Sequence, residues 1–358
     1  MKFMPKKSRC LKVPKTEGEK AIRIAHMLKI VDDELAVQRN GSHVYIPLNR
    51  DPTQEEYEIL KRNIMNMEVI DYTFPPREKP KTFLELLESK LPPYLFASIP
   101  KSMDIIGDIA IIEIAPELEP YKNDLGYAIL QAHKGIRTVL AKASAITGTY
   151  RLREFTLIAG ELKTETIHKE HGCKYYIDLA KVYFSPRLSY EHSRIASLVK
   201  ENETVVDMFA GVGPFSILIA KTHENVRVYA IDINPSAFEL LKRNIRLNRV
   251  ENKVHPILGD AKQVVEDRLK GIADRVIMNL PEKAIEFLDA ACKTIKPEGG
   301  TIHFYTFVKA SDSIENLKIR LQKEVEKAGR KVKRFLFSRN VRETAPYEWQ
   351  IVLDMEVL

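Results

Sequence analysis

The chain contains the run Val205-Val-Asp-Met-Phe-Ala-Gly-Val-Gly-Pro-Phe-Ser-Ile-Leu-Ile-Ala-Lys221, which predicts a buried strand, a glycine turn and a helix in immediate succession. In an α/β sheet, this succession is where a nucleotide binds. Asp207 would lie at the carboxyl end of the strand. Gly211 and Gly213 would let the backbone turn sharply and approach a ligand without interference from a Cβ atom.

The same turn favours S-adenosylmethionine (SAM) over a dinucleotide as the ligand. A dinucleotide fingerprint needs a third glycine at position 216, where this chain has Ser216. Asp207, which precedes the glycines, would accept hydrogen bonds from a cationic amino-acid group. This placement suits the methionine end of SAM better than a pyrophosphate.

Two further predicted strands also end in an acidic residue. The run 227–235 contains Asp232, where a carboxylate would accept the ribose hydroxyls of the ligand. The run 254–260 ends in Asp260, as expected for a group that contacts adenine. Each acid alone is explained equally well as a helix cap. Three acids at successive strand ends, one of them before a glycine turn, together indicate a SAM site.

A fourth predicted strand, 274–281, ends in Asn279-Leu280-Pro281. The rigid proline would hold the preceding backbone at the sheet edge and direct Asn279 toward a substrate. Methyltransferases that act on exocyclic amines of bases resemble this pattern, but they carry two prolines and an aromatic residue after the Asn or Asp. Leu280 and Glu282 depart from that pattern, and a capping role for Asn279 remains the alternative.

Composition places the chain among globular proteins with more than one domain. It has 358 residues, of which 44% are hydrophobic and 29% are charged. The net charge of +7 favours a polyanionic partner. The three cysteines are widely separated and form no CxxC pair, so no disulfide scaffold or zinc site is indicated. We find no secretion signal and no apolar run long enough for a membrane helix, and therefore expect a cytoplasmic protein without a membrane partner.

The pattern along the chain predicts three domains. Residues 1–74 form a small α/β unit with a hairpin at Asn40-Gly41, and the proline-rich, charged segment 75–81 is a linker. Residues 82–187 are α+β. Residues 188–358 alternate strands and helices as in a doubly wound sheet, and end in two strands, near 334–338 and 348–355, that should pair as an antiparallel hairpin. The predicted fold class is α/β, with a class I, Rossmann-like methyltransferase domain.

With these motifs in view, the chain resembles the archaeal tRNA (guanine-37 N1)-methyltransferase family over nearly its full length. The matching text is Lys181-Val-Tyr-Phe-Ser-Pro-Arg-Leu188, Asp207-Met-Phe-Ala-Gly-Val-Gly-Pro-Phe215, Ala230-Ile-Asp-Ile-Asn-Pro235 and Met278-Asn-Leu-Pro281. The resemblance implies a small amino-terminal domain that docks on the tRNA elbow and two further domains that hold the anticodon stem-loop. It also implies SAM as methyl donor and no metal ion, and we expect a monomer.

The resemblance assigns roles to individual residues. N1 of guanine carries a proton at neutral pH, so its methylation requires a base and a cation that stabilises charge on O6. Glu191 matches the base, and Arg151 matches the cation, with Arg153 left open as an alternative. Asn279 would orient the guanine edge. The implied cofactor-binding residues are Tyr183, Asp207, Phe209, Gly211, Gly213, Asp232, Asp260, Asn279 and Pro281.

Simpler explanations stand beside these assignments. Glu191 would equally suit the first turn of a helix, Arg151 a phosphate contact, and Tyr183 a packed core. At the level of function, the alternatives are a relative that also methylates a wyosine precursor, a ribosomal RNA base methyltransferase, and a non-enzymatic RNA-binding protein on a methyltransferase scaffold. Leu280 argues for the simple enzyme, because the wyosine relatives tend to carry the double-proline motif.

Overall fold

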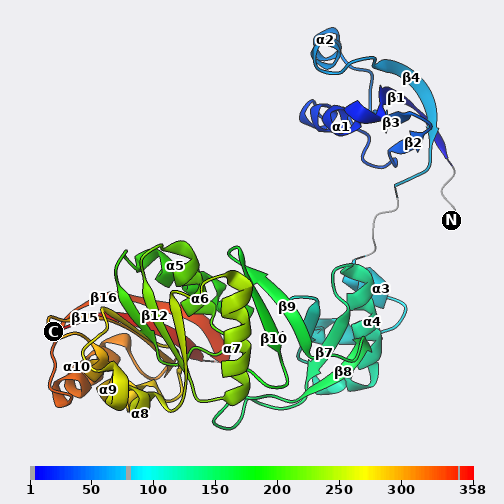
Figure 1. The fold of residues 1–358 in the computed structure, drawn as a ribbon. Coiled ribbons are helices and arrows are strands. Elements are labelled where there is room, and N and C mark those ends of the chain that lie inside the picture. Colours follow the sequence, from blue (N-terminus) through cyan, green and yellow to red (C-terminus); the bar gives the residue numbers. More distant parts are fainter. Residues whose placement is uncertain (1–4, 78–81, 346) are drawn as a thin grey trace. The chain divides into compact units, whose positions relative to one another are not determined.

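The computed structural model describes residues 5–77, 82–345 and 347–358, and the chain divides into two compact units, Met1–Lys81 and Thr82–Leu358. Figure 1 shows the elements in chain order. Short 3-10 helices lie at Lys15–Glu17, Pro93–Ser98, Pro116–Tyr121, Pro186–Leu188 and Ala284–Phe287, and a π-helical turn lies at Val265–Leu269. Within the described ranges, no helix is long and apolar enough to cross a membrane.

The first unit is a four-stranded antiparallel sheet with two helices. Its sheet has the order β2-β3-β1-β4. The elements are β1 (Lys6–Pro14), α1 (Gly18–Met27), β2 (Gln38–Asn40), β3 (His43–Pro47), α2 (Gln54–Asn63) and β4 (Glu68–Phe74). Strands β2 and β3 pair across the predicted Asn40-Gly41 turn, which confirms the hairpin. Helix α2 begins at a capping box, in which the Thr53 side chain accepts from the Glu56 backbone and the Glu56 carboxylate accepts from the Thr53 backbone.

The start of the predicted linker packs on this first unit. Pro76 forms an isolated bridge with Leu35, and the Arg77 backbone N–H donates to the Glu34 carbonyl at 2.7 Å. Residues 75–77 therefore continue the domain that we expected to end at residue 74, because backbone pairing holds them there. The remainder of the predicted linker, 78–81, lies outside the described residues.

The second unit begins with a four-stranded sheet of order β5-β6-β7-β8, in which only β6 and β7 are parallel. Its elements are α3 (Phe83–Leu87), β5 (Asp104–Ile106), β6 (Ile109–Ile112), α4 (Lys122–Ala132), β7 (Thr138–Lys142) and β8 (Phe155–Gly160). Leu87 of α3 and Ile129 of α4 pack with Val139 of β7 in one apolar core. The sequence predicted this part only as α+β, and the short apolar run of β7 carries no alternation that would mark it as a strand.

A two-stranded hairpin of β9 (Glu165–Glu170) and β10 (Cys173–Asp178) follows and lies beside helix α7 (Pro235–Asn248) (Figure 1). The Asn244 side chain accepts from the Tyr176 backbone N–H at 2.7 Å, and the Asn248 side chain accepts from the Lys174 backbone N–H at 2.9 Å. We expected a domain boundary at 187/188, which assigns this hairpin to the middle domain. The hairpin packs on both sides of that boundary, because α7 holds β10 while the Thr166 hydroxyl of β9 donates to Asp108 Oδ1 of the middle domain at 2.7 Å.

The last part of the chain is a seven-stranded sheet of order β13-β12-β11-β14-β15-β17-β16. Its strands are β11 (Thr204–Asp207), β12 (Arg227–Asp232), β13 (Val254–Leu258), β14 (Arg275–Met278), β15 (Gly300–Lys309), β16 (Val332–Ala345) and β17 (Glu348–Val357). The first five strands in this order run parallel, while β17 is antiparallel to both β15 and β16. The predicted closing hairpin is therefore confirmed, although β16 is longer than predicted.

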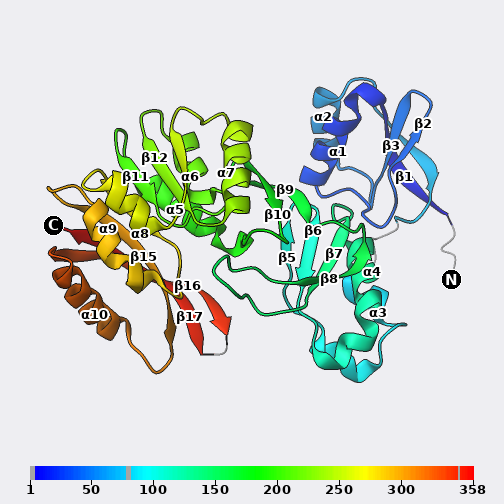
Figure 2. The ribbon, with the colours of Figure 1, turned by 60° about the horizontal axis from the view of Figure 1, so that its bottom comes forward.

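Helices cover both faces of this sheet (Figure 2). One face is covered by α5 (Ser189–Leu198), α6 (Pro214–Thr222) and α7 (Pro235–Asn248), and the other by α8 (Ala261–Val264), α9 (Leu288–Thr294) and α10 (Ile314–Lys327). This arrangement is the doubly wound sheet that the sequence predicts, and it places the carboxyl ends of β11, β12 and β14 at one edge.

Candidate functional site

A cavity of about 320 Å³ opens at the carboxyl ends of the parallel strands. Seven of the predicted cofactor-binding residues line it: Tyr183, Phe209, Gly211, Asp232, Asp260, Asn279 and Pro281. Arg151 lines it as well. Three predicted site residues, Asp207, Gly213 and Glu191, are not among the described residues that line the cavity. Each of them therefore needs a separate structural explanation.

Backbone geometry explains why a glycine occupies position 213. It has φ 91° and directly precedes Pro214, the first residue of α6. A Cβ atom there would lie 2.5 Å from Leu241 Cδ1 and 2.9 Å from Ile217 Cδ1. Gly213 is therefore required for the turn and for close packing of α6 against α7, rather than for contact with a ligand.

Asp232 holds the glycine turn while facing the cavity. Its Oδ2 accepts from the Gly211 backbone N–H at 2.7 Å and its Oδ1 accepts from the Asn234 backbone N–H at 2.9 Å. Burial raises the pKa of this carboxyl above its ordinary value, against these two hydrogen bonds. Each oxygen keeps a lone pair for a further donor, which suits a pair of ribose hydroxyls.

Asp260 caps a helix, as the simpler explanation predicts, and also faces the cavity. Its Oδ1 accepts from the backbone N–H groups of Lys262 at 2.9 Å and Gln263 at 3.3 Å, so it caps α8. It also lines the cavity at the end of β13. The capping bonds leave Oδ2 available to a ligand.

Asp207 is fully buried at the end of β11, and Ser216 is its partner. The Ser216 hydroxyl donates to Asp207 Oδ2 at 2.7 Å. Asp207 Oδ1 has no hydrogen-bond partner among the residues that the structure describes. Burial raises the pKa of Asp207 to about 7, although the Ser216 hydroxyl and the Phe209 backbone N–H oppose the rise. Ser216 thus stands at the dinucleotide glycine position because it hydrogen-bonds the strand-end acid.

Asn279 is oriented by a residue that the sequence did not reveal as part of the site. Gln350 of β17 is fully buried and donates through Nε2 to Asn279 Oδ1 at 3.3 Å. The adjacent Pro281 carbonyl accepts from the Thr306 hydroxyl at 3.2 Å. Asn279 and Gln350 both line the cavity. Asn279 is therefore placed by side-chain contacts from β17, in addition to the rigid backbone that we predicted.

Arg151 lies against the predicted aromatic wall. Its guanidinium carbon is 5.1 Å from the centroid of the Tyr183 ring. Its Nη1 is 3.2 Å from Glu282 Oε1, an ion pair by distance although the angle is not that of a hydrogen bond. Arg342 of β16, which we did not predict, donates to the Tyr183 hydroxyl at 2.9 Å and thereby fixes this ring.

Arg151 and Arg153 line different cavities, which distinguishes the two candidates for the cation. Arg151 lines both the main cavity and a neighbouring one of about 210 Å³, whereas Arg153 lines only the second. Arg153 Nε is buried and lacks a hydrogen-bond partner in the described part of the chain. The geometry thus favours Arg151 as the cation beside a substrate in the main cavity.

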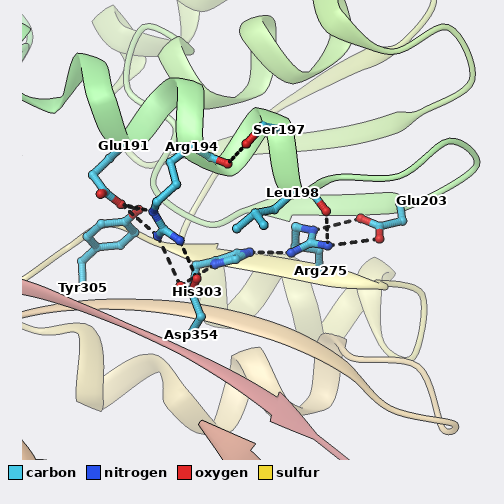
Figure 3. Close-up of polar contacts among 9 residues, drawn as sticks. All are labelled: Glu191, Arg194, Ser197, Leu198, Glu203, Arg275, His303, Tyr305 and Asp354. Carbon is cyan, nitrogen blue, oxygen red and sulfur yellow. Dashed lines mark hydrogen bonds and ion pairs between the residues drawn. The ribbon is translucent and has the colours of Figure 1, made fainter. Parts of the chain in front are cut away.

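Glu191 lies in the first turn of α5, as the simple helix explanation expects, but it is not a surface acid. Only 1% of its surface is exposed. The Tyr305 hydroxyl donates to Oε2 at 2.8 Å, and Arg194 Nε donates to the same oxygen at 3.0 Å (Figure 3). Oε1 is buried and has no hydrogen-bond partner among the described residues.

His192, next to Glu191, lines the cavity and was not predicted as a site residue. Its Nδ1 is 2.6 Å from Glu170 Oε1, and its ring packs edge-on against Phe215. His192, with His168, holds the pKa of Glu170 at about 2 against the opposing effect of burial. Among the described residues, no group of three or more His, Cys, Asp or Glu side chains is arranged to hold a metal ion.

Comparison with known protein families gives three matches. Residues 166–334 match the TRM5/TYW2 methyltransferase domain, residues 83–164 match the TYW2 N-terminal domain, and residues 10–58 match the tRNA methyltransferase 5 N-terminal domain. The match at residue 166 agrees with the packing of the β9–β10 hairpin on α7.

Similar proteins cover the whole chain. It is 42% identical over 348 residues to the tRNA (guanine(37)-N(1))-methyltransferase Trm5b of Pyrococcus abyssi. The aligned residues cover 97% of this chain and 98% of that protein. The Trm5b of Methanocaldococcus jannaschii is 38% identical, with 97% and 98% covered. The tRNA 4-demethylwyosine(37)-methyltransferase Taw21 of Saccharolobus solfataricus is 38% identical over 258 residues, which cover 72% of this chain and 94% of Taw21.

Solved structures agree with these relatives. The crystal structure of Trm5b from Pyrococcus abyssi has a TM-score of 0.70 at 41% identity and covers 98% of this chain and 99% of that chain. The complex of aTrm5 with tRNALeu has a TM-score of 0.69 at 36% identity, with 97% and 99% covered. Methanocaldococcus jannaschii TYW2 in complex with AdoMet has a TM-score of 0.56 at 34% identity, with 72% and 99% covered.

Proposed function

We infer that this chain, which belongs to the archaeal tRNA (guanine-37 N1)-methyltransferase family, uses SAM to methylate N1 of guanosine 37 in tRNA. The observation that carries this inference is the full-length similarity to Trm5b, which includes the amino-terminal domain. Taw21 matches over a shorter part of the chain, so the wyosine relatives are the more distant ones. Similarity to a tRNA-bound relative over 97% of this chain favours tRNA over ribosomal RNA as the substrate.

The residues around the cavity fit SAM. Asp232 offers free lone pairs beside the glycine turn, and Asp260 offers a free Oδ2 at the next strand end. Oδ1 of buried Asp207, which has no hydrogen-bond partner among the described residues, is an acceptor suited to a nearby ammonium group. Bound in this cavity, SAM supplies the electrophilic methyl carbon.

The remaining chemistry belongs to side chains of this protein. Glu191 Oε1, the carboxylate oxygen that no described residue contacts by a hydrogen bond, receives the N1 proton of guanine. The Arg151 guanidinium stabilises the negative charge that develops on O6. Asn279 orients the guanine edge, and Tyr183, fixed by Arg342, walls the cavity. Retention of these groups argues against a non-enzymatic RNA-binding role.

The larger contacts with tRNA follow from the domain organisation. We assign docking on the tRNA elbow to the amino-terminal unit and binding of the anticodon stem-loop to the rest of the chain, which acts as a monomer. Phosphate contacts by basic side chains would make both interactions sensitive to salt, in keeping with the net charge of +7.

Nucleoside mass spectrometry of unmodified tRNA after incubation with the protein and SAM tests the reaction. 1-Methylguanosine at position 37 is the expected product. A methylated wyosine precursor, or methylation of ribosomal RNA alone, would replace the proposal with one of its alternatives. No methylation of either RNA would leave only a binding function.

Glu191→Gln tests the assigned base in a single-turnover assay. The substitution keeps the size of the side chain but removes its basicity, so the rate should fall by roughly 10²–10⁴-fold while SAM affinity is retained. Glu201→Gln is the matched control, because Glu201 is a partly exposed carboxylate that accepts from the Asn225 backbone, away from the cavity. A Glu191→Gln variant that turns over like the control would exclude Glu191 as the base.

A further inference from the structure

A chain of buried and partly buried charged and polar groups runs from Glu191 to Glu203 (Figure 3). We call it the buried charge network, and its members are Tyr305, Glu191, Arg194, Asp354, His303, Arg275 and Glu203. The members come from α5, β14, β15, β17 and the loop before β11. The network therefore joins strands that are far apart in the sequence to the helix that carries Glu191.

The far half of the network fixes where its protons lie. Arg275 donates to Glu203 through Nε at 2.9 Å, and its Nη1 is 2.7 Å from His303 Nε2. A guanidinium only donates, so His303 Nε2 must accept. The proton of the neutral ring then lies on Nδ1, which donates to Asp354 Oδ1 at 2.6 Å. Burial lowers the pKa of His303, in agreement with a neutral ring.

Arg194 links Asp354 to Glu191. Its Nη1 donates to Asp354 Oδ2 at 2.6 Å, while its Nε and Nη2 lie 3.0 and 2.9 Å from Glu191 Oε2. Burial acts to raise the pKa of Asp354, but His303 and Arg194 bring it below the ordinary value, so Asp354 is ionised. A rigid guanidinium fork held by one carboxylate is a fixed cation for the other.

All donors to Glu191 therefore converge on one oxygen. The Tyr305 hydroxyl, at 2.8 Å, and both Arg194 contacts use Oε2, whereas Oε1 has no hydrogen-bond partner in the described ranges. Burial, followed by the charge of Glu191, raises the pKa of Tyr305 well above its ordinary value. Tyr305 is thus a permanent donor. The convergence leaves Oε1 as the acceptor oxygen without a donor among the described residues.

We propose that Tyr305 and Arg194 are positioning residues for methylation, which hold the Glu191 carboxylate through Oε2 so that Oε1 alone takes the N1 proton. The inference rests on the proposed role of Glu191 as the base. The N1–H bond breaks as the Oε1–H bond forms. The electron pair left on N1 forms the bond to the methyl carbon, and the pair of the breaking carbon–sulfur bond stays on sulfur.

The other charged groups near Glu191 leave this assignment in place. From β15, Tyr305 contacts Glu191 directly, and His303 acts through Asp354 of β17. On α5 itself, Arg194 is the contacting cation and His192 is paired with Glu170 of β9. The basic side chains at the C-terminal end of α6 are engaged elsewhere, since Lys221 donates to the Asn248 carbonyl and His223 contacts the Ala196 carbonyl.

Tyr305→Phe tests the proposal, because it removes one oxygen atom and keeps the buried ring. The measurement is the single-turnover methylation rate of full-length protein on tRNA across pH. Without the hydroxyl, the ionised carboxylate is less stable, so the acidic limb should move to higher pH by about one to two units. Arg194→Lys keeps the charge but loses the fork that spans Glu191 and Asp354, and its acidic limb should also move upward.

Tyr175→Phe is the matched control. Tyr175 is also a fully buried tyrosine, and its hydroxyl donates to the Pro214 carbonyl at 3.3 Å, outside the buried charge network. Its acidic limb should stay at the wild-type position. Thermal unfolding and SAM calorimetry establish that each variant is folded and binds SAM.

An acidic limb that stays at the wild-type pH in folded Tyr305→Phe and Arg194→Lys would overturn the proposal. An equal shift of the acidic limb in Tyr175→Phe would also overturn the proposal, because the shift would then reflect a general loosening of the core. If these limbs stay in place while Glu191→Gln abolishes turnover, the positioning role fails and the base survives. If Glu191→Gln retains full turnover, the base itself fails.

Discussion

Replacement of Asp207 by Asn should stabilise the protein by an amount that depends on pH. Asp207 is fully buried, and the Ser216 hydroxyl and the Phe209 backbone N–H are the groups that favour its charge. Burial raises its pKa from the ordinary 3.8 to about 7. Because the folded pKa lies above the unfolded one, Asp207 contributes stability at low pH, and that contribution is lost as the pH rises toward the folded pKa.

The size of this loss follows from the two pKa values. A rise from 3.8 to about 7 corresponds to about 4 kcal/mol of folding free energy once the pH exceeds both values. Over the practical window from about pH 5 to about pH 8, roughly 2 to 3 kcal/mol of this is lost. Asn has nearly the same shape and never ionises, so the stability of Asp207→Asn relative to wild type should grow by that amount over the window.

Denaturant unfolding followed by tryptophan fluorescence is a direct assay. Trp349, the single tryptophan of the chain, lies on β17 of the sheet that contains Asp207. The fitted quantity is the difference in unfolding free energy between variant and wild type at each pH, in which the titration of all other groups cancels. A constant offset from the new amide N–H group leaves the slope unchanged.

Asp178→Asn is the control for this prediction. Asp178 is also buried, but Lys181 and the Thr164 hydroxyl outweigh burial and lower its pKa below 3.8. Its contribution is therefore complete above about pH 5, and the stability of Asp178→Asn relative to wild type should be flat from there upward. A flat profile for Asp207→Asn as well would refute the claim that a buried, poorly compensated carboxylate ends β11.

Three further outcomes are expected. Asp232→Asn should weaken SAM binding by roughly 10- to 100-fold in calorimetry, because a charged acceptor becomes neutral; unchanged affinity would detach this strand end from the ribose. Gly213→Ala should destabilise the sheet by roughly 1 to 3 kcal/mol because its Cβ meets Leu241 and Ile217. Gly329→Ala, where no described residue lies within 4 Å of the added Cβ, should show only the smaller backbone cost. Deletion of Met1–Lys81 should impair methylation of full-length tRNA but spare SAM binding and the reaction on an isolated anticodon stem-loop; equal loss on both substrates would contradict the elbow role.

The sequence predicted the parts of the site that local patterns encode. Strand, turn and helix follow one another from residue 205 to 221, and acids end three neighbouring strands, so local patterns alone place Asp207, Asp232 and Asp260 at strand ends. Asp207 is nevertheless fully buried and absent from the cavity lining, and its Oδ2 accepts from the Ser216 hydroxyl. A strand-end position fixes the edge of a sheet, whereas the direction of a side chain depends on its partners.

The parts that the sequence did not reveal all depend on pairing between distant segments. Arg342 and Gln350 belong to strands that we predicted only as the closing hairpin, and neither has a spacing that indicates a ligand. His303 and Asp354 become partners through the antiparallel register of β15 and β17, in which they are directly opposite. That register is set by side-chain packing across the sheet, and a single sequence gives no local signal for it.

The closing hairpin also decides which group of Asn279 faces the cavity. Arg342 only donates, so the Gln350 oxygen must accept its Nε–H at 2.9 Å, and the Gln350 amide nitrogen is left to donate to Asn279 Oδ1. Asn279 then has its own NH₂ group free toward the cavity. In the proposed reaction this group meets the guanine edge as a donor, and O6 is the acceptor next to the N1 that loses its proton. The orientation of Asn279 is thus imposed from two hydrogen bonds away, by a strand more than 50 residues further along the chain.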